Sequence, residues 1–472
     1  MPPKYALKFL RWFCREDYLE EIEGDLTEVF ERQYETSPKK AKWKFSWSVI
    51  RYFRPAFIKS FKSSYHPSLF AMLRHNLLLT FRTFKRYKTS FFINLIGLSS
   101  GLACTLLIYL WVNDELSVDK FHENDKQLFQ VMMNHTHDNK IQTMEQTHGI
   151  LAKALMEEFP EVEASVAIAP RIGYKNTGIL SSGKKYIKAN SKFVGKDFFK
   201  MFSYTLLEGD KNQVLSDKSS VVISEEIAIN LFHTTGNAVG KVIQWEKDDN
   251  REQFQITGVF QNMPNHSTMK LDLVFTYDLY LEKSPHFQTW EGASGPATYI
   301  KLKENTDVKR FNGNIVNFLK TKNAKLKFTL FTRPYSDSYL YSHYENGIQS
   351  GGRIEYVRLF ATIAFFILLI ACINFMNLAT ARASRRLKEI GIKKALGANR
   401  KVLILQFIVE SSVITILSVI LSVLLVVLFL PQFNVITEKY LVLALSPNLM
   451  LSLLGIIVFT ALLSGSYPAF YL

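Results

Sequence analysis

The chain has 472 residues and a formal net charge of +15, and 48% of its residues are hydrophobic. This length suggests about three domains. The hydrophobic share is not extreme for a soluble protein, but the apolar residues are segregated: several runs are almost purely apolar, and a long middle region is polar. The three cysteines exclude a disulfide framework from that middle region, because none of them lies in it.

The net positive charge of the chain comes from two segments that border apolar runs. Residues 1–90 carry 18 Lys and Arg against 9 Asp and Glu, and residues 381–401 carry 8 against 1. The region 113–355 is nearly balanced, with 29 basic and 30 acidic residues. Cationic segments beside membrane spans stay on the cytoplasmic side. We therefore expect both basic segments inside the cell and residues 113–355 outside.

The N-terminal residues 1–60 predict a small helical cytoplasmic domain. Apolar residues recur at helical spacing through residues 1–36, with acidic residues between them. A basic and aromatic stretch follows at residues 39–55. Such a stretch can indicate nucleic-acid binding, but aromatic and basic side chains also favour a membrane interface. We prefer the lipid bilayer as the partner and expect no nucleic acid, because membrane spans follow. Residues 69–90 predict an amphipathic helix on the membrane surface.

Four apolar runs are long enough to cross a bilayer, which takes roughly 20 residues. They are residues 91–112, 359–380, 402–430 and 449–471. The first run starts too late in the chain for a cleaved signal peptide. Together with the charge pattern, these runs predict a helical membrane protein with four transmembrane helices, a large α+β extracytoplasmic domain and a small helical cytoplasmic N-terminal domain.

Three residues inside these runs are candidates for a specific role. Gly97 and Gly101 form a GxxxG pattern, which allows close packing of membrane helices, although glycine is also common in spans by chance. Glu410 lies near the inner end of the third run. An intramembrane carboxylate is a functional candidate; the alternative is an interfacial residue that pairs with Arg400 or Lys401 and orients the helix.

The region 113–355 mixes helices and strands. Residues 150–159 and 225–232 predict short helices, and residues 220–224 and 254–260 predict strands. A polar, glycine-rich segment at the end of this region, residues 339–352, predicts a hinge into the second span.

No catalytic signature occurs in the sequence. The phosphate-binding pattern GxxxxGK[ST], the zinc pattern HExxH and the nucleophile pattern GxSxG are all absent. His135, His137 and His148 lack an acidic or cysteine ligand at metal-binding spacing, and we interpret them as loop histidines. We therefore expect a non-catalytic protein without a metal ion or cofactor.

Several segments resemble the FtsX-like and MacB-like family of ABC transporter permeases. The residues 379–411, ATARASRRLKEIGIKKALGANRKVLILQFIVES, are similar to the hallmark cytoplasmic loop of that family. Residues 115–124, 198–210, 220–224 and 256–264 resemble its MacB-like periplasmic core domain. The N-terminal residues 2–55 resemble a permease prefix domain.

The resemblance implies a permease in the bacterial inner membrane that works by mechanotransmission. A separate cytoplasmic ABC ATPase would bind the loop between spans two and three and move it, and the spans would pass that motion to the periplasmic domain. The coupling residues implied are Glu389, Ile390, Gly391, Lys393, Lys394, Leu396 and Gly397. A periplasmic adaptor and an outer-membrane channel are further partners by analogy, and the cargo is not identified.

Many relatives are twice as long, with a second periplasmic domain and four further spans. The resemblance therefore implies either a half-length subunit that pairs, as a homodimer or with a second permease half, or a fragment of a longer permease. The alternative function is a membrane sensor with a periplasmic ligand-binding domain. A sensor needs a cytoplasmic output domain, for which the prefix domain is the candidate.

Overall fold

A computed structural model describes residues 2–35, 37–54, 57, 69–138, 140–170, 176–248, 250–291, 294–385, 388, 391–392, 395–396, 400–444 and 447–471. The chain divides into two compact units. One unit comprises Met1–Lys88 with Ala398–Val413, and the other comprises Thr89–Gly397 with Ile414–Leu472.

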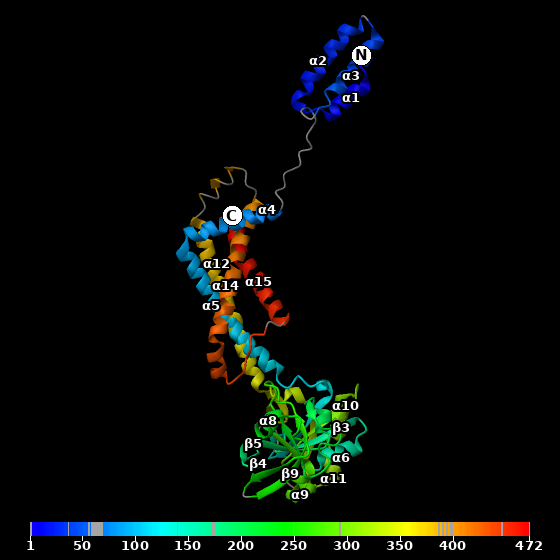
Figure 1. Cartoon of the computed structure of the whole chain (residues 1–472), viewed down its shortest axis with the longest axis vertical. Coiled ribbons are helices and arrows are strands. Elements are labelled where there is room, and N and C mark those ends of the chain that lie inside the picture. Colours follow the sequence, from blue (N-terminus) through cyan, green and yellow to red (C-terminus); the bar gives the residue numbers. More distant parts are fainter. Residues whose placement is uncertain are drawn as a thin grey trace. The chain divides into compact units, whose positions relative to one another are not determined.

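Three helices at the N-terminus enclose a core of their own: α1 (Lys4–Phe13), α2 (Glu16–Tyr34) and α3 (Pro38–Arg51) (Figure 1, blue). Each helix buries one stripe of apolar residues at helical spacing. The stripes contain Leu10 and Phe13 on α1, Ile22, Leu26 and Phe30 on α2, and Ala41, Phe45 and Val49 on α3. Pro38 stands in the first turn of α3, where its missing N–H leaves no helical bond unmade. Helix α4 (Leu69–Arg86) follows.

The polar middle region folds as an α+β domain between the first two long apolar helices. Its strands are β1 (Leu128–His137), β2 (Lys140–Met144), β3 (Val162–Ala169), β4 (Thr177–Ser182), β5 (Lys185–Val194), β6 (Leu206–Glu208), β7 (Ser220–Ser224), β8 (Val242–Lys247), β9 (Asn250–Phe260), β10 (Leu273–Thr276), β11 (Ala297–Leu302), β12 (Phe328–Pro334), β13 (His343–Glu345) and β14 (Ile348–Gly351). Its helices are η1 (Asp125–Gln127), α6 (Leu151–Glu158), α7 (Phe198–Met201), α8 (Glu225–Phe232), α9 (Tyr277–Lys283), η2 (Pro285–Gln288), α10 (Val308–Ile315), α11 (Phe318–Lys322) and η3 (Tyr335–Asp337).

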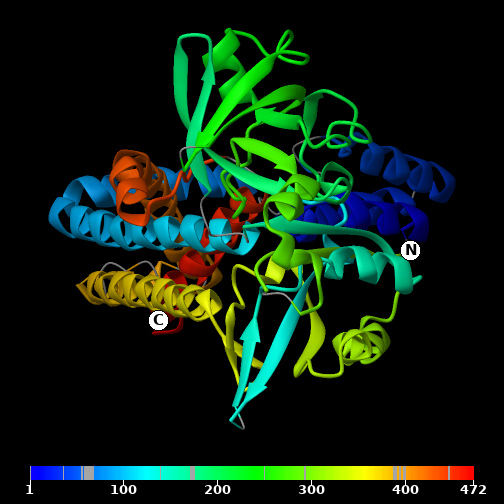
Figure 2. The ribbon, with the colours of Figure 1, turned by 90° about the horizontal axis from the view of Figure 1, so that it is seen from below.

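Part of the main sheet closes on itself. The order β10-β7-β9-β8-β4-β5 returns to β10 through a parallel β5–β10 pairing. The sheet continues from β5 through β3, β11 and β1 to β12. One apolar cluster packs α8 against the closed part, and another packs α6, α10 and α11 against the open part. Strand β2 pairs with β1 in a hairpin that Figure 2 shows as two cyan arrows. The domain is therefore built as two neighbouring halves.

Three helices of the described chain are long and apolar enough to cross a membrane: α5 (Lys88–Ser117), α12 (Arg353–Arg385) and α14 (Arg400–Thr437). The fourth predicted span falls on α15 (Pro447–Tyr471), whose apolar described part, Leu449–Thr460, is shorter. Helix α15 packs along α12 (Figure 1). The fourth span, and with it the number four, stays a prediction.

Two segments differ in detail from the sequence-based expectation. Helix α14 continues past Pro431 to Thr437, although proline removes one backbone hydrogen bond from a helix. The expected hinge at residues 339–352 contains the β13–β14 hairpin, in which Asn346 and Gly347 both have positive φ angles. An Asn-Gly pair of this kind is a strong hairpin signal, so the sequence does carry the information for this turn.

Candidate functional site

Only part of the predicted coupling segment lies within the described residues. Glu389, Ile390, Lys393, Lys394 and Gly397 lie outside them.

The described part of the segment presents two apolar side chains. Ile392 and Leu396 stand one helical turn apart, joined by a backbone hydrogen bond of 3.0 Å, and are 63% and 83% exposed. Gly391 has helical backbone, and a methyl group there would meet no atom of the described residues within 4 Å. Exposed leucine and isoleucine at adjacent turns offer an apolar contact surface.

The two glycines of the GxxxG pattern lie on the side of α5 that faces α12. A Cβ atom at Gly101 would stand 2.6 Å from the Cβ of Ala371, whereas one at Gly97 would stand 3.5 Å from Asn374 Nδ2. One turn further along α5, Thr105 Oγ1 lies 3.4 Å from the carbonyl oxygen of Ala364. The two helices therefore approach more closely at Gly101 than at Gly97.

Glu410 is buried on α14, with 7% of its surface exposed. It has an interaction partner, so it is not an isolated charge.

A cluster of charged residues joins the ends of three membrane segments at the α+β domain. We call it the junction cluster: Asp114 and Glu115 at the end of α5, Tyr339 shortly after η3, Arg353 at the start of α12, and Lys439 after α14. Arg353 donates two hydrogen bonds to Glu115, Nε to Oε2 at 2.6 Å and Nη2 to Oε1 at 3.0 Å. Such a two-pronged pair fixes geometry as well as charge.

Lys439 completes the junction cluster from a third segment. Its Nζ lies 2.6 Å from Asp114 Oδ2 and 3.0 Å from Glu115 Oε1. Burial opposes the charge on Lys439, but the two carboxylates outweigh it and raise the pKa of its ammonium group. Glu115 is fully buried, so each of its oxygens depends on these partners. The cluster therefore ties α5, α12 and the segment after α14 to one another.

The end of α5 is also anchored in the core of the α+β domain. Asp119 accepts hydrogen bonds from the backbone N–H and the hydroxyl of Thr268, and its own N–H donates to the carbonyl of His266 at 2.9 Å. His122 lies next in the core, where its Nδ1 accepts the N–H of Ser203 at 3.1 Å. Burial, with His266 nearby, lowers the pKa of His122 to about 4. The segment that follows α5 is therefore bonded to the core of the domain.

This buried histidine predicts a loss of stability in acid. The pKa of His122 is lower in the folded chain than in the unfolded chain. The neutral, buried imidazole therefore stabilises the fold fully above pH 6.5, and this stabilisation is lost as the pH falls toward 4. Between pH 7 and pH 5 we expect the free energy of unfolding to fall by about 2 kcal/mol from this residue. Chemical unfolding of the parent and of His122→Asn, which keeps an acceptor but does not titrate, measures the difference. An equal pH dependence in both would contradict the assignment.

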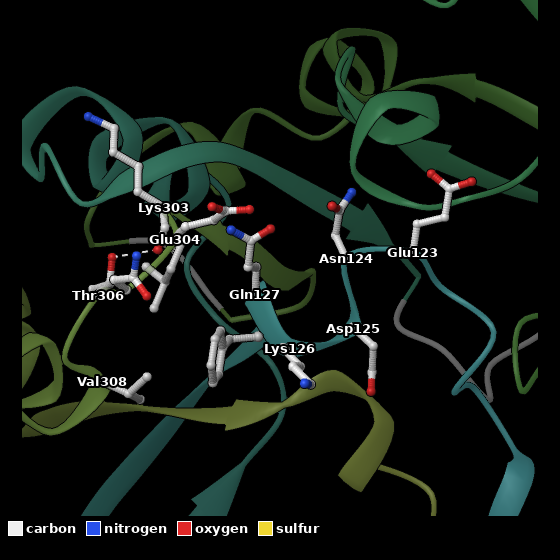
Figure 3. A pocket seen from close by; sticks show the side chains of 12 residues that line it. Glu123, Asn124, Asp125, Lys126, Gln127, Lys303, Glu304, Thr306 and Val308 are labelled. Carbon is white, nitrogen blue, oxygen red and sulfur yellow. Dashed lines mark hydrogen bonds between the residues drawn. The ribbon is translucent and has the colours of Figure 1, made fainter.

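A pocket with a volume of about 550 Å³ lies on the described residues between η1 and the β11–α10 connection. Its charged side chains have both signs: Glu123, Asp125 and Glu304 against Lys126 and Lys303. Figure 3 shows their charged ends spread apart instead of converging on one point. This arrangement does not define a binding centre for a single small ligand.

The three histidines of the sequence analysis are not all loop residues, because His135 and His137 stand on β1. The rings of His135 and His137 lie 6.0 Å apart on the exposed end of β1, while His148 is buried beside Trp290. Across the described part of the chain, no group of three or more His, Cys, Asp or Glu side chains could hold a metal ion.

Comparison with known proteins assigns the chain to a family. Residues 91–318 match the model of the MacB-like periplasmic core domain, and residues 361–472 match the model of the FtsX-like permease C-terminal domain. The chain belongs to the FtsX-like and MacB-like ABC transporter permeases. Relatives with curated names agree. The α+β domain is therefore a MacB-like periplasmic core domain, carried between apolar helices of a permease.

The individual relatives are distant. The chain is 23% identical to the macrolide export ATP-binding/permease protein MacB of Mannheimia succiniciproducens over 55% of this chain and 38% of that protein. MacB of Campylobacter jejuni is 24% identical over 63% of this chain and 44% of that protein. The uncharacterised ABC transporter permease YvrN of Bacillus subtilis is 28% identical over 49% of this chain and 55% of that protein. The chain thus spans less than half the length of these MacB relatives.

Two solved structures are each similar to a little under half of this chain. A domain of a putative permease protein from Porphyromonas gingivalis has a TM-score of 0.38 and 19% identity, over 45% of this chain and 93% of that one. The periplasmic region of MacB from Actinobacillus actinomycetemcomitans has a TM-score of 0.33 and 18% identity, over 47% of this chain and 95% of that one.

Sequence reasoning missed the junction cluster as a site in this permease. The signal was present: Asp114 and Glu115 directly follow the first apolar run, Arg353 precedes the second, and Lys439 stands in the short polar break before the fourth. Charges at the two ends of a span are usually interpreted as interface anchors. Only the folded arrangement shows that these particular charges meet.

Proposed function

We propose that this chain is the membrane subunit of an ABC transporter that couples a separate cytoplasmic ATPase to its periplasmic domain by mechanotransmission. In this mechanism ATP-driven movement of the 381–401 segment passes along α12 and α5, and the periplasmic domain performs export or extraction of a substrate that stays unidentified. The chain itself would be non-catalytic, since its sequence has no phosphate-binding loop.

The observation that carries the proposal is the double anchoring of α5. At its periplasmic end α5 is bonded to α12 through Glu115 and Arg353 and to the domain core through Asp119. A helix held rigidly at that end transmits a displacement of its other end, because packed helices shift as units. The exposed Ile392 and Leu396 supply an apolar surface in the segment that would receive the ATPase.

The orientation belongs to the same proposal. Both basic segments, residues 1–90 and 381–401, would face the cytoplasm of a bacterium, and residues 113–355 would face the periplasm. An ATPase dimer engages two permease halves, so we propose that the subunit pairs as a homodimer or with a second permease half. A periplasmic adaptor and an outer-membrane channel would be further partners.

Co-purification with the cognate ATPase tests the proposal. Replacing Glu389 and Leu396 together, Glu389→Ala with Leu396→Asp, should weaken ATPase binding at least about tenfold, because it removes the Glu389 carboxylate and puts a charged side chain in place of the exposed Leu396. The matched control is Ile348→Asp on the β13–β14 hairpin, which is similarly exposed and should leave binding unchanged. Full retention of the ATPase by the double variant would reject the coupling assignment.

A further inference from the structure

The N-terminal three-helix domain has a strongly uneven charge distribution. All acidic residues of residues 1–54 lie on α2 and the residue that ends it, whereas α1 and α3 contain none. Arg11 on α1 pairs with Glu23 on α2. The cations of α3 all project into solvent: Lys39, Lys40, Lys42, Lys44 and Arg51. One side of the domain is therefore cationic and another is acidic.

The cationic helix α3 also exposes large aromatic side chains. Trp43 and Trp47 stack with their rings 6.1 Å apart and nearly parallel, and they are 67% and 58% exposed. Ile50 continues this exposed stripe. By helical spacing the stripe lies opposite the buried residues Ala41, Phe45 and Val49 of α3.

Helix α1 extends the aromatic surface. Its exposed Tyr5, Phe9 and Trp12 share one face, and the ring of Phe9 lies 5.9 Å from Trp12 and 5.7 Å from Phe53, just after α3. We call these aromatic residues of α1 and α3, with Ile50, Phe53 and the cations of α3, the aromatic-cationic face. Exposed apolar residues gathered in this way mark a contact surface.

The composition of this face favours a lipid surface over a protein partner. Four of the five cations on α3 are lysines, which protein interfaces tend to exclude from their centres. Tryptophan and tyrosine, by contrast, concentrate at membrane–water interfaces. Anionic lipid headgroups attract clustered lysines. The acidic residues of the domain are carried by α2 and its last residue, and none stands on α1 or α3, which form the face.

The chain also keeps this domain near a bilayer. Seventeen residues, 52–68, separate α3 from α4, and they can span at most about 60 Å. Helix α4 leads into α5, which is long and apolar enough to cross a membrane. A short tether raises the effective concentration of the domain at the lipid surface, so that weak individual contacts suffice.

We propose that the N-terminal domain binds an anionic phospholipid surface through its aromatic-cationic face. Hydrogen–deuterium exchange of the full-length protein in nanodiscs tests this. Peptides from α1 and α3 should exchange more slowly in nanodiscs that contain phosphatidylglycerol than in nanodiscs of phosphatidylcholine alone. Peptides from α2 should exchange equally in both, and they report that the domain stays folded.

Two sets of variants sharpen the test. Each lysine near an anionic lipid surface strengthens binding roughly fivefold. The double variant Lys40→Gln with Lys44→Gln should therefore lower the ratio of lipid-bound to free domain by more than about tenfold. Arg15→Gln with Arg32→Gln removes the same charge from either end of α2 and should keep the protection. Equal exchange in both lipids, protection that appears only when the ATPase or a nucleic acid is added, or equal loss in both variant pairs would overturn the proposal.

Discussion

Replacement of Arg353 by alanine should lower the free energy of unfolding by about 3 kcal/mol, because it leaves the buried carboxylate of Glu115 without its two-pronged partner. Breaking a buried ion pair typically costs about 3–5 kcal/mol. We expect the lower end here, since Lys439 stays 3.0 Å from Glu115 Oε1 and the Arg353 side chain is itself 45% exposed. Chemical unfolding in mild detergent measures the change.

Two further variants separate the ionic contact from a general loss of packing. Arg353→Lys keeps the charge but cannot donate the paired bonds, so it should lose roughly 1 kcal/mol. The double variant Glu115→Leu with Arg353→Met replaces the pair by apolar groups of similar size and should be close to the parent in stability. A double variant as unstable as Arg353→Ala would show that the pair matters for its packing and not for its charges.

Variants of Glu115 and Arg353 can also distinguish the stability of the protein from its transmission of motion between the membrane helices and the periplasmic domain. The stable double variant should still transmit motion poorly, because apolar contacts are less directional than the two hydrogen bonds that they replace. Spin labels at Ile348 and Leu424, both exposed, report the distance between the β13–β14 hairpin and α14. In the parent reconstituted with its ATPase, this distance should change on addition of ATP. An equal change in the double variant would mean that the junction cluster is not the route of transmission.

The sequence allowed the local elements to be predicted better than their meeting points. Strand β7 and helix α8 agree with the predicted residues 220–224 and 225–232, because a run of β-branched residues is followed by a serine N-cap whose hydroxyl accepts the Ile227 N–H. The closure of the sheet by the β5–β10 pairing was not predictable, since these strands are about 80 residues apart and nothing local specifies their register.

The candidate site divides in the same way. The coupling segment is a contiguous string of residues whose family resemblance is visible in the sequence, whereas the junction cluster unites residues more than 200 positions apart along the chain. Burial of a charge is not visible in a sequence: Glu115 looked like one of many acids beside a span, and its full burial with Arg353 is what marks it. The sequence therefore shows which charged residues stand beside the spans, but only the folded structure shows which of them pair with one another.

Gly101→Ala should destabilise the packing of α5 against α12, whereas Gly97→Ala should not. A methyl group at Gly101 would stand 2.6 Å from the Cβ of Ala371, far inside van der Waals contact, and Ala371 has no flexible atoms that could move aside. Overpacking of this kind costs about 1–3 kcal/mol. At Gly97 the nearest atom is 3.5 Å away, the end of the Asn374 side chain, so the methyl group fits.

The two variants control for each other, because each exchanges the same residues within the same helix. Alanine is the better helix former by about 1 kcal/mol, a gain that both variants share in α5. Unfolding in detergent should therefore place Gly97→Ala at or above the parent and Gly101→Ala below it, with a gap of at least about 1 kcal/mol between them. If the two variants proved equally stable, α5 and α12 would not approach closely through Gly101, and the proposed path from the 381–401 segment through α12 to α5 would lose this contact.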